Sequence, residues 1–237
     1  MKSNTFLFEA VDLTHTLSPD IPGWDGDCGF RLSRALDYAD CAPPDVFRKH
    51  DMQTPTGIGT HIDAPAHCVP GGATIESLDM HNLITDCVVI KIDTHDIDTH
   101  DDEHYLIMPE AVEAFEKEHG EIAANTFVIF YTGWDKHWHT PEKYINDHKF
   151  PSVHGSTAEL LLKRNIAGLG IDTLSADTGA EGFPVHRAIL GAGKYLVENI
   201  ARAGSLPPTG ARSFALPMKI KDGAEAPIRL VALVPKT

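Results

Sequence analysis

The sequence predicts a mixed fold of helices and strands, of the α/β or α+β class. Apolar runs of strand length alternate along the chain with segments that show the period of amphipathic helices. Gly and Pro are scattered as turn formers, and there is no internal repeat or low-complexity linker. A chain of 237 residues can bury one sizeable core, so we expect a single domain over residues 1–237.

The first half of the chain contributes two expected strands, a turn and a helix. Residues 10–17 alternate polar and apolar side chains as a strand does, and residues 18–27, rich in Pro, Gly and Asp, then turn the chain. Residues 86–93 carry β-branched apolar side chains and predict a buried strand. Residues 109–119 predict an amphipathic helix that begins at a Pro and is followed by Gly120.

The second half begins with a similar alternation of strand and helix. Residues 125–133 predict a hydrophobic strand that ends at a glycine turn, and residues 166–172 predict another strand. Between them, residues 156–165 predict a helix, with Ser156 as the N-cap and Glu159 three residues later in a capping box.

Three further segments complete the chain. Residues 183–193 predict a short helix, and residues 195–200 predict a strand or a junction between strand and helix. Residues 227–235 are apolar and β-branched and predict a closing strand. Strands and helices are therefore intermixed over the whole length, which leaves both α/β and α+β arrangements open.

The charge balance argues against nucleic-acid and membrane partners. The chain has 20 Lys and Arg against 34 Asp and Glu, a formal net charge of −14. It lacks the basic cluster that a nucleic-acid interface needs. No apolar run approaches the roughly 20 residues of a transmembrane helix.

The cysteines and the N-terminal residues predict a cytoplasmic protein. The N-terminal sequence lacks the apolar run and the small-residue cleavage site of a signal peptide. The four cysteines form no C-x-x-C pair, and we interpret them as reduced thiols. Cys68 follows a histidine, so a ligand or nucleophile role is conceivable, but a small packing residue is the favoured interpretation.

The most informative run is T-G-I-G-T-H-I-D-A-P-A-H, which brings His61, Asp63 and His67 within seven residues. On a strand, His61 and Asp63 would project from one face and Ile62 from the other, toward the core. An imidazole and a carboxylate can both reach one divalent ion at about 2.0–2.2 Å. A free imidazole at His67 would suit proton transfer near neutral pH. The alternative is a polar loop whose histidines bond to the backbone.

Two other histidine-rich segments carry less information. Residues 93–104 are acidic and lack the apolar residues that would fix a metal geometry, which favours a solvated loop. His137 and His139 lie in a segment whose two tryptophans, Trp134 and Trp138, can pack it as a surface lid.

The run G-T-H-I-D-A-P-A-H resembles the H-x-G-T-H-x-D-x-P-x-H signature of the cyclase family of metal-dependent hydrolases, which includes kynurenine formamidases and isatin hydrolases. Four further blocks are similar to the family in the same order: D-L-T-H-T-L-S-P-D-I-P-G-W, F-V-I-F-Y-T-G-W, G-L-G-I-D-T-L-S-A-D and V-H-R-A-I-L-G-A-G-K-Y-L-V-E-N-I. Together these blocks span roughly residues 11 to 200.

The resemblance implies a role for each matching residue. His61 and Asp63 would be metal ligands, His67 the catalytic acid and base, and Glu198 a further ligand. His186, twelve residues before Glu198, would be a ligand of a second metal. From the residues alone, the favoured interpretation is that His186 caps or packs a helix.

The sequence departs from the signature at Gly57, where the family has its first His. One ligand is therefore missing, and we expect a single Mn²⁺ or Zn²⁺ ion held by His61, Asp63 and Glu198, with His186 as a further candidate ligand. Gln53 is a candidate for a replacement oxygen.

The family resemblance implies hydrolysis of an amide bond in a small aromatic or cyclic amide, of the arylformamide or isatin type. The ion would activate water, and His67 would transfer the proton. Trp24 and Phe30, with Trp134 as a further candidate, would line an aromatic pocket, with core packing as the competing role. The alternatives are a metal-dependent cyclase or dehydratase of a biosynthetic pathway and a non-catalytic metal-binding protein.

The resemblance also implies a fold and an assembly. It predicts the mixed β/β/α fold of the cyclase family, with a central barrel-like sheet and flanking helices. It further predicts that the protein forms a homodimer or homotetramer. The expected binding partner other than copies of the chain itself is a small-molecule substrate.

Overall fold

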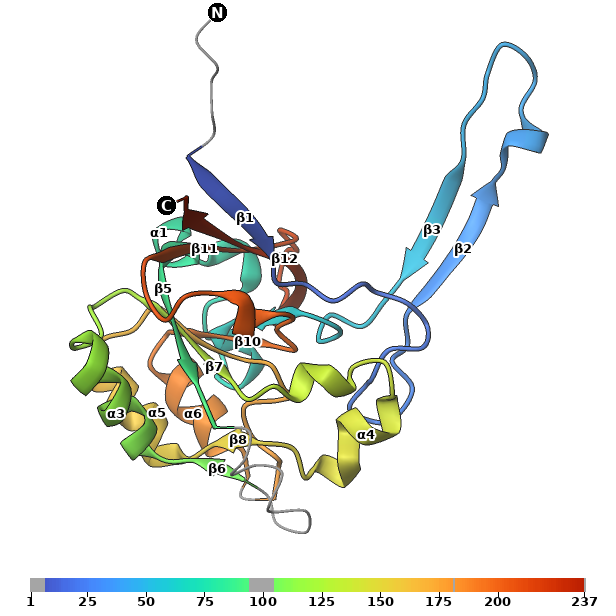
Figure 1. The fold of residues 1–237 in the computed structure, drawn as a ribbon. Helices are drawn as coiled ribbons and strands as arrows, with labels where there is room; N and C mark the ends of the chain where they lie inside the picture. Colours follow the sequence, from blue (N-terminus) through green and yellow to red (C-terminus); the bar gives the residue numbers. More distant parts are fainter. Residues whose placement is uncertain (1–6, 94–104, 181, 237) are drawn as a thin grey trace, which may run out of the picture.

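The computed structural model describes residues 7–93, 105–180 and 182–236, and in them a seven-stranded sheet closes on itself (Figure 1). An eighth strand, β1 (Phe8–Asp12), pairs antiparallel with the ring at β12. The mixed α/β class and the barrel-like sheet are therefore confirmed. In order around the ring the strands are β12 (Glu225–Pro235), β11 (Ala211–Pro217), β5 (Ile84–Lys91), β7 (Phe127–Tyr131), β9 (Gly168–Ile171), β10 (Tyr195–Glu198) and β4 (His61–Asp63), which pairs with β12 again.

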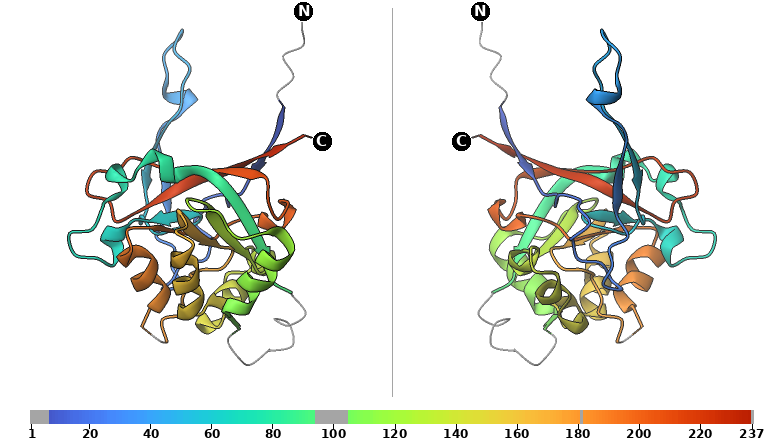
Figure 2. Two further views of the ribbon diagram at one scale, coloured as in Figure 1. Left: turned by 90° about the vertical axis from the view of Figure 1, so that its left-hand side faces the viewer. Right: turned by 90° about the vertical axis from the view of Figure 1, so that its right-hand side faces the viewer.

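Four consecutive strands of the ring are parallel and are covered by helices. Strands β5, β7, β9 and β10 run parallel, and the other pairings are antiparallel. The connections between the parallel strands carry α3, α5 and α6, which lie together on one side of the sheet (Figure 2). The helices of the described residues are α1 (Met80–Leu83), α3 (Pro109–His119), α4 (Pro141–Ile145), α5 (Gly155–Lys163) and α6 (Pro184–Gly191). Within the same residues, no helix has the length and apolar character to cross a membrane.

Strand β7 shows why the sheet is buried on both faces. Phe127 and Ile129 pack inside the ring, whereas Val128 and Phe130 pack toward the helices. All four side chains are fully buried. A strand between two cores needs apolar residues at every position, which explains the unbroken hydrophobic run in the sequence.

The helix ends follow local sequence, with one exception. Helix α3 runs from Pro109 to His119 as predicted, and Gly120 ends it with a φ of 92°, a conformation that glycine adopts without strain. The predicted N-cap at Ser156 is wrong. Helix α5 begins at Gly155, and His154 is the cap, because its Nδ1 accepts a hydrogen bond from the Ser156 N–H at 3.2 Å.

A long hairpin projects from the body of the protein and was not predicted. Strands β2 (Arg31–Leu36) and β3 (Lys49–Gln53) pair antiparallel and extend away from the barrel (Figure 1). We call residues 31–53 the arm. Its exposed side chains include Leu32, Val46 and Phe47, each more than half exposed. Strand β11 and the short parallel pair of β6 (Leu106–Ile107) with β8 (Ser152–Val153) were also not predicted.

Replacing Phe130 with Ala should lower the free energy of unfolding by about 3–5 kcal/mol, because it leaves a cavity between β7 and the helices. Met218→Ala is the matched control and should change it by less than about 0.5 kcal/mol, because Met218 is 44% exposed. Urea unfolding measures both values. Equal losses would contradict the assignment of Phe130 to the core.

Candidate functional site

Two neighbouring strands and one helix bring four polar side chains to a single point outside the barrel. Strand β4 lies antiparallel to β10, and His61 stands directly opposite Glu198. Ile62 is buried inside the ring, so His61 and Asp63 point to the opposite face, as the alternation of a strand predicts. His186 reaches the same face from the first turn of α6.

The donor atoms of these four residues face one another. His61 Nε2 lies 3.4 Å from Asp63 Oδ1 and 3.6 Å from Glu198 Oε2. His186 Nε2 lies 3.6 Å from Asp63 Oδ2 and 3.4 Å from Glu198 Oε1. All four residues are buried, although each is polar or charged. We call them the inner cluster.

The inner cluster fits a divalent metal ion. Both carboxylate oxygens of Asp63 are buried and accept no hydrogen bond, which is costly unless a cation is present. Metal bonds of about 2.0–2.2 Å place neighbouring ligand atoms roughly 3–3.6 Å apart, as the atoms of the inner cluster are. Asp63, His186 and Glu198 also each offer a ligand atom within 4.8 Å of the others.

The electrostatics of the inner cluster favour positive charge at its centre. Burial lowers the pKa of His61, but Asp63 and Glu198 outweigh burial and raise it above its ordinary value. Burial is likewise outweighed at His186, where Asp177 and Asp63 raise the pKa well above its ordinary value. Burial and the Asp63 charge raise the pKa of Glu198. The negative charge of the two buried carboxylates must therefore be balanced, either by protons on the side chains of the cluster or by a metal ion.

Each imidazole is oriented by a hydrogen bond at its other nitrogen. Nδ1 of His186 donates to Asp177 Oδ2 at 2.8 Å, and Nδ1 of His61 donates to the Gly59 carbonyl at 2.9 Å. Both Nε2 atoms therefore face the inner cluster, where each carries either a proton or, in the neutral ring, a lone pair that can bind a metal. This pairing of a carboxylate or carbonyl with a ligating histidine is typical of metal sites.

Glu198 and the residue after it are also held in place. Glu198 Oε1 accepts hydrogen bonds from Ser175 Oγ at 2.8 Å and from Ala176 N at 2.9 Å. Asn199 donates through Nδ2 to the same Gly59 carbonyl at 2.9 Å, which links β10 to the loop before β4. Strand β10, which supplies Glu198, is therefore followed directly by the residue that holds the Gly59 carbonyl, and that carbonyl orients His61.

His67 lies at the mouth of the inner cluster. It ends the 3-10 turn η2 (Pro65–His67), and its side chain is 34% exposed. Its ring centroid is 5.8 Å from that of His186, and its Nδ1 is 3.7 Å from Glu225 Oε1. An imidazole beside the ligands but open to solvent is placed to exchange a proton with water or substrate.

A cavity of about 240 Å³ opens above the inner cluster. Trp24 and Phe183 supply aromatic walls, and their ring centroids lie 5.8 Å apart. Phe30 does not line this cavity; it is buried in a core that also contains Tyr144. Trp134 donates through Nε1 to the Tyr144 carbonyl at 2.9 Å and packs on that core.

Sequence reasoning missed three residues of the site. Asp177 lay within a recognised block but had no assigned role, and Phe183 and Glu225 were not considered. Phe183 has a φ of 58°, a left-handed conformation that is unusual for a bulky residue. Glu225 begins β12 and pairs with Asp63, a contact that only the closed ring creates.

The remaining candidates lie elsewhere. His139 lines a separate cavity with His15, and Gln53 is exposed at the end of β3. Cys68 is exposed and is therefore not the small packing residue that was favoured. The acidic, histidine-rich residues 94–104 lie outside the described part of the chain.

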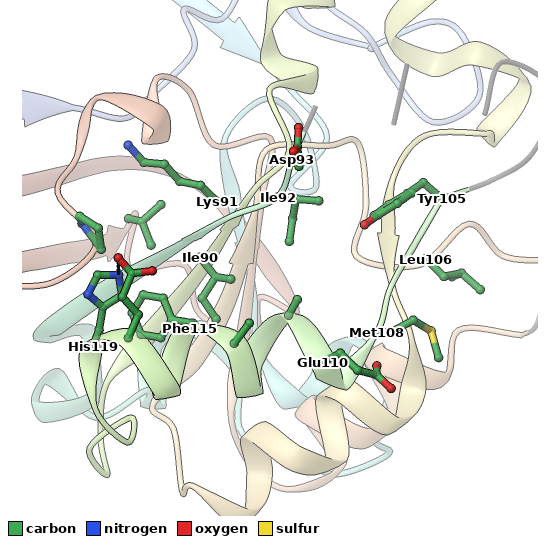
Figure 3. Close-up of a pocket in the computed structure, with 15 residues that line it drawn as sticks. Ile90, Lys91, Ile92, Asp93, Tyr105, Leu106, Met108, Glu110, Phe115 and His119 are labelled. Atoms are coloured by element: carbon green, nitrogen blue, oxygen red, sulfur yellow. Dashed lines mark ion pairs between the residues drawn. The ribbon is translucent and has the colours of Figure 1, made fainter. Parts of the chain in front are cut away.

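A larger hollow, of about 560 Å³, is lined by residues of β5 and α3 and has a different chemistry (Figure 3). Ile90, Ile92 and Phe115 form its apolar wall, with Lys91 and Glu110 at its rim. Among its described residues there is no convergent set of imidazoles and carboxylates. Size alone therefore does not identify the active site, and the smaller cavity over the inner cluster is the candidate.

Two buried imidazoles, two buried carboxylates and an unligated histidine at a small cavity define the site of a metal-dependent hydrolase. The chain belongs to the cyclase family, because the model described as "Putative cyclase" matches residues 11–178. The recognised resemblance is therefore confirmed.

The comparisons also identify individual relatives. The isatin hydrolase of Roseibium aggregatum is 34% identical, and the match covers 96% of this chain and 92% of that protein. The kynurenine formamidase of Erythrobacter litoralis is 26% identical, over 90% of this chain and 88% of that protein. An isatin hydrolase structure with the product analogue thioisatinate has a TM-score of 0.87 at 29% identity, covering 97% of this chain and 94% of that one. This chain is therefore a metal-dependent hydrolase that acts on amide C–N bonds.

Replacing Asp177 with Asn should weaken metal binding about 10- to 100-fold, because His186 loses the carboxylate that orients it. Competition with a chromophoric chelator measures the affinity. Asp86→Asn is the control, since that side chain is 72% exposed on the far strand β5. Unchanged affinity in Asp177→Asn would refute the orienting role.

Proposed function

We propose that the substrate of this metal-dependent amide hydrolase is a small cyclic aromatic amide of the isatin type. The isatin hydrolase of R. aggregatum shares more sequence with this chain than the kynurenine formamidase of E. litoralis does, at 34% against 26% identity. The cavity supports the same choice, because about 240 Å³ between Trp24 and Phe183 suits a compact, flat ring better than an extended side chain.

The observation that carries the proposal is that two features occur at one site: Asp63 is buried without a hydrogen bond, and His67 lies at the cavity mouth. Asp63 requires a cation, and His67 can carry a proton because it is not one of the metal ligands. A protein that only stored metal would need the first and not the second.

His61, Asp63, His186 and Glu198 would hold a divalent ion, Mn²⁺ or Zn²⁺, and carboxylates with imidazoles accept either. When bound, the ion lowers the pKa of water and polarises the substrate carbonyl. His67 takes a proton from the attacking water and delivers it to the leaving nitrogen. Water adds across the amide, the C–N bond breaks, and a carboxylate and an amine remain on the product. Trp24 and Phe183 orient the ring and exclude water from its faces.

The purified protein should hydrolyse isatin faster than N-formylkynurenine or simple aryl esters, and a chelator should abolish the reaction.

His67→Ala should retain its metal while losing roughly 10²- to 10⁴-fold in kcat, because general acid–base catalysis contributes about that much. Asp63→Ala should lose the metal, as measured by elemental analysis. Chelator-insensitive turnover, or full activity in His67→Ala, would refute the mechanism.

We also propose a cytoplasmic homodimer or homotetramer assembled through the arm. The four cysteines are free thiols, which suits a reducing compartment. The arm extends away from the barrel (Figure 1), and within it Val46 is 74% and Phe47 53% exposed. Large apolar side chains on a projecting hairpin are typical of an interface between subunits.

Replacing Val46 with Asp should dissociate the oligomer, because a charge would be buried at the interface. Sedimentation velocity measures the mass over a range of protein concentration. Met80→Asp is the matched control, since Met80 is 53% exposed on α1, away from the arm. A monomeric wild-type protein, or an unchanged oligomer in Val46→Asp, would rule out assembly through the arm.

A further inference from the structure

The hydrogen bond that orients His61 continues into the core of the protein. The Gly59 carbonyl accepts two donors, His61 Nδ1 and Asn199 Nδ2, each at 2.9 Å. A carbonyl oxygen has two lone pairs, and these two N–H groups use both. The position of this oxygen therefore decides where the His61 ring points, and Asn199 holds the oxygen in that position.

Asn199 holds the loop before β4 at two successive residues. Besides the bond to Gly59, its own carbonyl accepts a hydrogen bond from Thr60 Oγ1 at 2.6 Å. Gly59 has a φ of 59°, and a glycine can turn its carbonyl toward other directions at little cost. Asn199 has a φ of 56°, which asparagine tolerates better than most residues. The carbonyl that orients a metal ligand therefore needs the asparagine to stay in place.

The amide of Asn199 is held in turn by a buried phenol. Tyr144, in α4, is fully buried, and its Oη donates to Asn199 Oδ1 at 2.9 Å. The same Oη lies 2.9 Å from the Asp172 carbonyl, so one proton serves two buried acceptors. A reversed amide would place Oδ1 against the Gly59 carbonyl oxygen, and neither atom has a proton to share. The observed orientation is therefore the one that satisfies the amide on both sides.

Tyr144 is fixed by the tryptophan-rich segment around it. Trp134 Nε1 donates to the Tyr144 carbonyl at 2.9 Å, and the Trp138 ring meets the Tyr144 ring edge-on with centroids 5.1 Å apart. Neither tryptophan lines the cavity over the inner cluster. Both therefore pack around the phenol and keep its hydroxyl directed at Asn199.

We propose that Tyr144 and Asn199 are positioning residues for the metal ligand His61. The Tyr144 hydroxyl holds the Asn199 amide, and this amide holds the Gly59 carbonyl. That carbonyl accepts the Nδ1 proton of His61, so the neutral ring directs the lone pair of Nε2 into the inner cluster. We call these contacts the Tyr144 network. The inference rests on the metal-dependent function proposed above.

A comparison of the two imidazoles supports the Tyr144 network. His186 donates to the carboxylate of Asp177 at 2.8 Å, whereas His61 donates to a neutral carbonyl. A hydrogen bond to a charged acceptor is roughly twice as strong as one between neutral groups. His61 is therefore held less strongly by its own acceptor, and its orientation depends more on what fixes that acceptor.

The first test is the Mn²⁺ affinity of the metal-free protein, measured by competition with a chromophoric chelator. Asn199→Gly removes the amide, suits the left-handed backbone and should weaken binding about 10- to 100-fold. Tyr144→Phe leaves Asn199 Oδ1 without its donor and should weaken binding about 5-fold or more. Tyr195→Phe is the matched control, because its hydroxyl is also buried but has no hydrogen-bond partner. Its affinity should equal that of the wild type.

The double variant separates one network from two independent structural losses. If Tyr144 acts through Asn199, the variant with both Tyr144→Phe and Asn199→Gly should lose no more affinity than Asn199→Gly alone. Losses that multiply would overturn the network, as would wild-type affinity in Tyr144→Phe. Wild-type affinity in Asn199→Gly would also overturn it, which keeps the test decisive if Tyr144→Phe cannot be purified.

The second test is proton exchange at the ligating rings in protein saturated with Co²⁺. The paramagnetic ion should shift the Nδ1 proton resonances of His61 and His186, and Asp177→Asn identifies the one from His186. In Tyr144→Phe and Asn199→Gly, the His61 proton should exchange with solvent faster while the His186 proton does not change. A loss of packing alone would not select one ring, so equal effects on both rings would overturn the network.

The outcomes also separate the network from the proposed function. A wild type that binds neither ion would overturn both. Weaker binding in the variants of a protein that hydrolyses no amide would support the network and refute the proposed function. Unchanged binding and exchange in the variants of an active enzyme would overturn the network alone.

Discussion

The buried, unsatisfied carboxylate of Asp63 is the constraint on which the rest of the site depends. An ionised group that leaves water without a hydrogen bond costs several kcal/mol, and no backbone donor repays this for Asp63. The neighbouring strands and helix place side chains around Asp63 that can hold a cation beside it. Histidines approach from β4 and α6, and a further acid enters from β10. Each of these three side chains also forms a hydrogen bond outside the cluster that orients it toward the ion position.

Strand β4 makes this arrangement possible because it closes the barrel. It has only three residues, yet it pairs with β10 on one side and with β12 on the other. Its central residue, Ile62, packs into the core, and its two outer residues face the ion position. The strand that closes the sheet therefore also supplies two of the four residues of the inner cluster, His61 and Asp63. A ligand that binds only the folded chain then also stabilises the closed sheet, because binding and closure are thermodynamically linked.

The sequence alone predicted what local patterns determine. The period of two over His61 to Asp63 and the caps of the helix at Pro109 were readable from neighbouring residues. His186 and Glu198 needed the family resemblance, because a helix and a strand far along the chain approach β4 only in the folded protein. Glu225 was not found, since its position depends on ring closure. The arm was missed because the side chains of its strands are almost all exposed, so their sequence carries no clear alternation of polar and apolar residues.

Asp177 does more than orient an imidazole. Its two oxygens accept the backbone N–H groups of Val185 at 3.1 Å and His186 at 2.9 Å in the first turn of α6. The first N–H groups of a helix have no partner within the helix, and together they carry a partial positive charge of about half an elementary charge. This charge would repel a cation held by His186. The carboxylate neutralises that end of the macrodipole. With this carboxylate at its N-terminus, helix α6 can present a metal ligand from its first turn. Without it, the positive end of the helix would lower the affinity for the ion.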